Sequence, residues 1–129
     1  MEQAVDTNII LRYIVGDDKL QQKKARELFE KAEKGKLKLL IKPLIVAEAC
    51  FVLESFYKRE KHEIADTFEI FLSQKWLKVE DREVMLNMWD WYRKNLHFVD
   101  SYLLSWAKVN EGKIVSFDKK LLKNLSSNL

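Results

Sequence analysis

The chain has 129 residues, of which 47% are hydrophobic and 33% charged, and its net charge is +3. This is an ordinary globular balance, enough for one domain with a buried core. No apolar stretch is long enough to span a membrane, and the start lacks the pattern of a secretory signal. One cysteine, Cys50, allows neither an internal disulfide nor a thiolate zinc cluster and is expected to be a small buried apolar group. We therefore expect a soluble cytoplasmic protein with a single domain over residues 1–129.

Strand-like and helix-like patterns alternate along the chain, with no repeat or linker dividing it. Short apolar runs predict strands, and helical spacing of apolar residues predicts helices between them. The expected strands span 3–6, 37–42, 76–80 and 113–117. The expected helices span 8–15, 18–35, 43–58, 62–73, 82–95 and 97–112, and a short helix is expected after Asp118. This alternation predicts an α/β fold, a three-layer α/β/α sandwich with a central parallel sheet.

Four acidic residues stand in apolar settings, where desolvating a carboxylate is costly. Asp6 lies in "AVDTNIIL" and Glu48 in "IVAEACFVL". Asp100 lies in "HFVDSYLL" and Asp118 in "IVSFDKKLL". In open α/β sheets, sites form outside the carboxyl ends of the strands. Because Asp6 ends the first expected strand and Asp118 the last, both are expected at the same rim of the sheet.

The other two acids are expected on helix faces that look inward. Glu48 shares an apolar helical face with Leu44 and Phe51, so this face should be buried. Glu54 lies about 120° away around the same helix and is expected to pair with Lys58 in solvent. Asp100 precedes Leu104 and Ala107 on one stripe, which places it on a buried face as well.

Each acid also has a plainer interpretation, except one. Asp6 and Asp118 each precede an expected helix and could simply be N-caps. Asp100 could interact with the start of its own helix. Glu48 has no capping role in the middle of a helix, and no basic residue shares its face. All four acids can reach the same rim of the expected sheet, and this favours a common site.

Four carboxylates packed together would repel one another, and a divalent cation removes this repulsion. Oxygen ligands without Cys or His favour a hard ion, Mg²⁺ or Mn²⁺. Such a site polarises a phosphodiester and helps deprotonate an attacking water. If these four acids bind a cation, the rest of the chain has 23 basic and 16 acidic residues. This excess of positive charge attracts a polyanion. The pattern predicts phosphodiester hydrolysis.

The segments "VDTNIIL", "IVAEACFVL", "FVDSYLLSWA" and "SFDKKL", in this order, closely resemble the PIN domain, and more narrowly the VapC-type toxins of toxin–antitoxin pairs. The resemblance implies a Mg²⁺- or Mn²⁺-dependent endoribonuclease that leaves 5′-phosphate and 3′-hydroxyl ends. Asp6, Glu48 and Asp100 would hold the metal, and Asp118 would be the fourth acid. Family members commonly form homodimers, and a cognate antitoxin blocks the site. Many relatives continue into another strand after the fourth acid, so this sheet is expected to lack an edge strand.

The resemblance also implies supporting roles. Asn8 and Ser116 match positions that support the site through hydrogen bonds. Arg12, Lys119 and Lys120 could contact RNA phosphates, or they could be ordinary solvated cations.

Other functions stay open beside the toxin ribonuclease. The chain could be a PIN nuclease of RNA processing, a DNA-directed nuclease, or a catalytically silent RNA-binding module. A phospho-acceptor signalling domain is disfavoured, because such a domain needs an acidic pair after its first strand and this strand is followed by a single acid.

Overall fold

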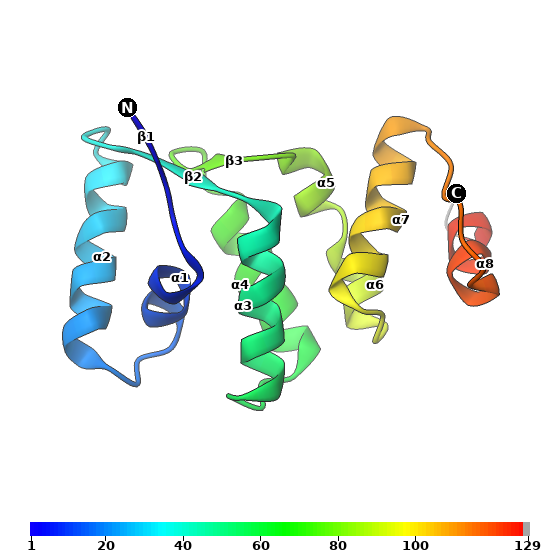
Figure 1. Ribbon diagram of the computed structural model, residues 1–129. Helices are drawn as coiled ribbons and strands as arrows, with labels where there is room; N and C mark the ends of the chain where they lie inside the picture. The colour runs from blue at the N-terminus through cyan, green and yellow to red at the C-terminus, as the bar shows by residue number, and fades with distance from the viewer. Residues whose placement is uncertain (128–129) are drawn as a thin grey trace.

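The computed structural model describes residues 1–127, and its centre is a parallel sheet. Strands β1 (Glu2–Ala4), β2 (Lys38–Ile41) and β3 (Lys78–Val79) lie in the order β1-β2-β3. Ala4 stands opposite Leu40, and Ile41 stands opposite Val79. Strands joined by helices and paired in parallel confirm the predicted α/β sandwich (Figure 1).

The helices begin where the sequence supplies N-terminal signals. Asp18 accepts a hydrogen bond from the amide of Gln21 at 3.0 Å and so caps α2, and Pro43 occupies the first turn of α3. The helices are α1 (Thr7–Ile14), α2 (Lys19–Glu33), α3 (Pro43–Ser55), α4 (Lys61–Leu72), α5 (Arg82–Leu86), α6 (Trp89–Arg93), α7 (Phe98–Asn110) and α8 (Lys119–Ser127). Within residues 1–127, none of them has the length and apolar character needed to cross a membrane.

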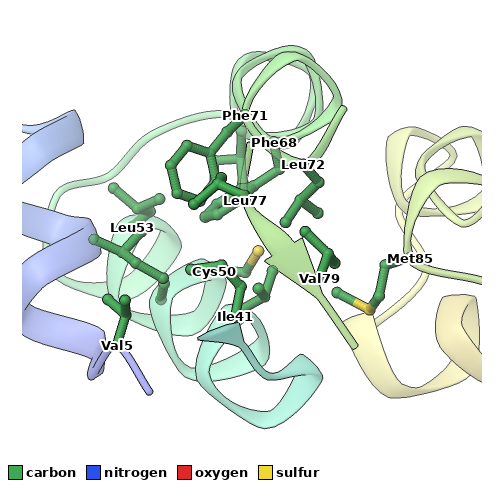
Figure 2. Packing of buried hydrophobic residues seen from close by; sticks show 14 of the residues in the cluster. Val5, Ile41, Cys50, Leu53, Phe68, Phe71, Leu72, Leu77, Val79 and Met85 are labelled. Atoms are coloured by element: carbon green, nitrogen blue, oxygen red, sulfur yellow. The ribbon is translucent and has the colours of Figure 1, made fainter. Parts of the chain in front are cut away.

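The core lies between the sheet and the helices packed on it (Figure 2). Leu39 and Ile41 of β2 are buried, as parallel strands usually are. The rings of Phe68 and Trp89 stack with their centroids 5.6 Å apart and their planes 6° apart. Cys50 is buried among these apolar groups, as expected.

The expected helix over 82–95 is wrong in one respect, because it breaks into α5 and α6. The side chain of Asn87 donates to the carbonyl of Glu83 at 2.7 Å and ends α5. Met85, Met88 and Trp89 join the main core, while Trp91, beyond the break, packs in a separate cluster with Leu104 and Leu121. The different packing partners of the residues on the two sides of the break account for the difference.

The expected strand over 113–117 does not form in the described structure. The segment has no regular secondary structure, and Val115 and Phe117 are fully exposed. The following helix, α8, packs against α7, where Leu121 joins Trp91 and Leu104 in a small apolar cluster. This contact holds the end of the chain beside α7, and Figure 1 shows α8 at the opposite end of the molecule from β1.

Candidate active site

Asp6 lies where β1 ends. The amide of Val5 still pairs with the carbonyl of Leu40 at 3.0 Å, and Asp6 follows it as the N-cap of α1. One carboxylate oxygen of Asp6 accepts a hydrogen bond from the amide of Ile9 at 3.1 Å. Asp6 is exposed, and within residues 1–127 no other hydrogen bond to its side chain is formed. The capping role is real, and it leaves Asp6 able to bind a ligand as well.

Glu48 lies on the outer face of α3, so the expectation that it looks inward is wrong. On the same face, Leu44 is 77% exposed and Phe51 is 69% exposed. The helix buries its opposite face, which carries Val46, Ala49, Cys50 and Leu53. Because α3 is apolar nearly all round, spacing alone could not tell which face is buried.

The expected pairing of Glu54 with Lys58 is also wrong. Glu54 is half-buried and accepts a hydrogen bond from the hydroxyl of Tyr92. Burial, followed by the nearby Cys50 and Glu54, raises the pKa of Tyr92 above its ordinary range. Lys61 lies over the Tyr92 ring, 4.5 Å from its centroid. Glu54 therefore belongs to a structural network rather than to the candidate site.

Asp100 lies in the first turn of α7 and is half-buried, close to its expected placement. Leu104 and Ala107, on its stripe, are buried. Within residues 1–127, neither Glu48 nor Asp100 has a side-chain hydrogen bond or an ion pair. Two carboxylates without a protein partner are available to a cation.

The three helices that carry or follow these acids are neighbours. Helix α3 packs against α1 on one side and α7 on the other. Between α3 and α7 lies an open groove of about 440 Å³. Ala47 and Val99 line it, and Glu48 and Asp100 come directly after them in the chain. The groove is lined by Lys42, Pro43, Leu44, Ala47, Glu80, Asp81, Phe98, Val99 and Tyr102.

Two further acids at this groove were not singled out from the sequence. Glu80 and Asp81 follow β3 at the carboxyl rim, and the "ED" pair after "WLKV" was the signal that could have identified them. Glu80 accepts from Lys42 at 3.2 Å. Asp81 accepts from the Tyr102 hydroxyl at 2.8 Å, and burial together with this acid raises the pKa of Tyr102 to about 12. Both acids already have partners, whereas Glu48 and Asp100 have none within residues 1–127.

Asp118 is placed elsewhere. It caps α8, accepting from the amides of Lys120 at 3.0 Å and Leu121 at 3.1 Å. Its own amide donates to Ser116 Oγ at 2.9 Å, while Asn8 is exposed on α1. Because 113–117 forms no strand, a single copy of the chain does not bring Asp118 to the rim that holds Asp6 (Figure 1).

The basic candidates differ in their surroundings. Arg12 donates to Asp17 at 3.1 Å and to Gln21 at 2.7 Å, so its guanidinium is engaged within the protein. Lys119 and Lys120 are exposed at the start of α8, and neither forms an ion pair with the part of the chain that the structure describes.

A separate group of potential ligands lies at the start of α4. Glu60, His62 and Glu63 bring ligand atoms within 4.8 Å of one another, and all three residues are exposed. Within the described residues no other trio meets this distance, so the four predicted acids do not. The group follows the C-terminal end of α3, whereas the sheet rim lies at the N-terminal end of that helix.

Comparison with known families decides the identity of the domain. The family model described as "PIN domain" matches residues 4–126, a range that includes all four predicted acids. The chain belongs to the PIN domain family. Searches for similar curated proteins and for similar solved structures gave no match. PIN domains are typically metal-dependent nucleases, which are hydrolases, and the family suggests RNA binding.

Proposed function

We propose that this PIN domain is a Mg²⁺- or Mn²⁺-dependent endoribonuclease that hydrolyses RNA phosphodiesters. The observation that carries the proposal is the pair Glu48 and Asp100. They stand on adjacent helices, directly after residues that line one groove, and neither has a partner in the described part of the protein. Carboxylates brought together at such a groove would repel one another, and a cation bound between them would remove that repulsion.

The donor set fits a hard divalent ion. Asp6, Glu48 and Asp100 offer only carboxylate oxygens, which Mg²⁺ and Mn²⁺ prefer, and each is exposed or half-buried and so within reach of solvent ions. These three residues would hold the metal, and Asp118 would be the fourth acid in an assembly that brings it to the same rim. The ion would supply polarisation of the phosphate and a more acidic water. The hydrogen bond from the amide of Ile9 keeps the Asp6 carboxylate in place at the end of β1.

The chain's own cations complete the proposed substrate contacts. Lys119 and Lys120 are exposed next to Asp118 and would bind RNA phosphates as point charges. Arg12 would do so only if it left Asp17, with which it forms an ion pair. We therefore assign phosphate binding to the two lysines and a structural role to Arg12.

We also propose that the domain is the toxin of a VapC-type toxin–antitoxin pair, with a cognate antitoxin and a homodimeric assembly. The four motifs that resemble these toxins support this role. A second candidate is a catalytically silent RNA-binding module. The spacing of the acids favours it, because no three of the four bring their ligand atoms within 4.8 Å of one another.

A cleavage assay distinguishes the two candidates. The purified chain is incubated with RNA and Mg²⁺ or Mn²⁺, with and without EDTA, and the new ends are mapped. Cleavage that needs the metal and leaves 5′-phosphate ends supports the nuclease. RNA binding without cleavage in either metal supports the silent module.

Asp18→Asn is a matched control for Asp6→Asn. Asp18 caps α2 by accepting a hydrogen bond from the amide three residues later, that of Gln21, at 3.0 Å, as Asp6 does in α1. We expect Asp6→Asn to abolish cleavage and Asp18→Asn to retain it.

A further inference from the structure

The edge strand β1 is unusually exposed to solvent for a strand of a parallel sheet. All three of its residues, Glu2, Gln3 and Ala4, are exposed, although parallel strands are normally covered on both faces. In the described structure β1 pairs with β2 and with no other strand. Its second edge therefore presents unpaired backbone groups, which readily accept another strand.

Residues 113–117 have the sequence of a strand but pair with no sheet in the described structure. The sequence KIVSF has the β-branched and aromatic character of a strand. Among residues 1–127, no backbone–backbone hydrogen bond involves this segment. Val115 is 101% exposed and Phe117 is 106% exposed, so their apolar surface is uncovered. Within residues 1–127, Ser116 Oγ accepts from the amide of Asp118 and Ile114 packs beside Leu121, while the backbone of the segment pairs with no other backbone group.

The structure fixes this segment away from the β1 of its own chain. Where the chain leaves α7, Gly112 packs against Trp106, and a Cβ at this position would come within 2.5 Å of the Trp106 ring. Beyond the segment, Leu121 is buried against Trp91 and Leu104, with Ile114 packed beside them. Figure 1 places α7 and α8 at the end of the molecule opposite β1. Pairing within one chain would require giving up this cluster.

We propose that β1 receives residues 113–117 of a second copy of this chain as a fourth, parallel strand. The addition satisfies the free edge of β1 and covers Val115 and Phe117, and Leu121 keeps its contacts with Trp91 and Leu104. Each copy carries both the donor segment and the acceptor edge, so the exchange can be reciprocal.

A register that aligns Phe117, the carboxyl end of residues 113–117, with Val5, the residue after β1, has a consequence for the active site. It sets Gln3 beside Val115, and Ala4 beside Ser116. Asp118 of one copy then comes to the rim that holds Asp6 of the other. The second copy thereby supplies the acid that a single copy places at the far end of the molecule. This consequence rests on the proposed function, whereas the strand addition does not.

Cysteine crosslinking tests the strand addition independently of any activity. Gln3→Cys and Val115→Cys are prepared as separate single variants, mixed and oxidised. Both positions are exposed, and the native Cys50 is buried and should not react. We expect a disulfide between positions 3 and 115, identified by mass spectrometry, at twice the monomer mass. The control mixes Val115→Cys with Lys34→Cys, an exposed position at the end of α2, and should give little product.

Two results would overturn the proposal. One is a mixture of single variants that crosslinks no better than the control. The other is a Gln3→Cys/Val115→Cys double variant that forms only an internal disulfide within monomers, since this would mean that each chain closes on itself. Light scattering gives a second readout. Phe117→Asp should reduce the assembled fraction several-fold, and Phe56→Asp, at a residue 73% exposed on another surface, should not.

Complementation tests the shared site. Asp6→Asn and Asp118→Asn should each be inactive, and their mixture should recover about a quarter of the parent's cleavage, since half of randomly mixed pairs contain one intact site of two. No recovery with crosslinking intact would remove Asp118 from the site and leave the strand addition standing. Inactivity of the unmutated chain itself would instead count against the proposed function.

Discussion

The carboxylate of Asp6 accepts a hydrogen bond from the amide of Ile9 at 3.1 Å, so the first acid of the candidate site is also the N-cap of α1. The two roles can be separated by substitution. Asparagine caps helices as well as aspartate does but carries no charge. Alanine neither caps a helix nor carries a charge. Asp6→Asn should lose RNA cleavage at unchanged stability. Asp6→Ala should lose cleavage and about 1 kcal/mol of unfolding free energy. An active Asp6→Asn variant would leave the residue with a structural role only.

Glu48 and Glu54 lie on one helix and provide a matched pair. Glu54 accepts a hydrogen bond from Tyr92, and Glu48 has no partner among the described residues. Glu54→Gln should lower the unfolding free energy by about 1–2 kcal/mol, because it weakens a charge-assisted hydrogen bond. Glu48→Gln should leave stability unchanged and reduce cleavage. Urea titration and the RNA assay on both variants measure the two effects, and equal stability losses would contradict the assignment.

The core should depend strongly on one aromatic stack. Phe68 and Trp89 are both buried, with ring centroids 5.6 Å apart. Phe68→Ala removes this contact and leaves a cavity, so we expect a loss of about 3–5 kcal/mol in unfolding free energy. Ile70→Ala is the control, since Ile70 is 67% exposed on the same helix and should cost far less. Chemical denaturation of both variants gives the comparison.

Cys50 should be inert in the folded protein. It is fully buried, and burial raises the pKa of its thiol above the ordinary value, so little thiolate forms at neutral pH. A thiol reagent at pH 8 should modify it only after unfolding in denaturant. Rapid labelling of the native protein would show that this part of the core opens readily.

Asp17 should make stability depend on acid pH. The hydroxyl of Tyr57, and then Arg12, hold the pKa of the Asp17 carboxyl below its ordinary 3.8. A lowered folded pKa contributes stability that is present above 3.8 and is lost as the pH falls through the folded value. The difference in Tm between the parent and Tyr57→Phe should therefore be largest near neutral pH and shrink below pH 3.8. A difference that grows on acidification would contradict this sign.

The sequence predicted the elements whose apolar spacing and end signals agree. Asp18 and Pro43 mark the true starts of α2 and α3, and the apolar run before Lys42 forms β2. Prediction failed where two apolar faces compete. On α3 the pattern cannot distinguish the face with Glu48 from the face with Cys50, and only packing against the sheet decides between them.

Whether residues 113–117 form a strand could not be predicted from the sequence. Their side chains have strand character, but strands form only where an edge is within reach. In the described structure Leu121 packs against Trp91 and Leu104, and Ile114 of the expected strand packs beside them. These contacts between distant parts of the chain place Asp118 beside α7, and no local pattern in the sequence reveals them.

Calorimetric titration with Mn²⁺ tests the central claim most directly, because the chain offers two candidate metal sites. Binding should be lost in Glu48→Gln and in Asp100→Asn. It should persist in His62→Ala, which disrupts the trio of Glu60, His62 and Glu63. The opposite pattern, with binding abolished by His62→Ala and unaffected by Glu48→Gln and Asp100→Asn, would contradict the account.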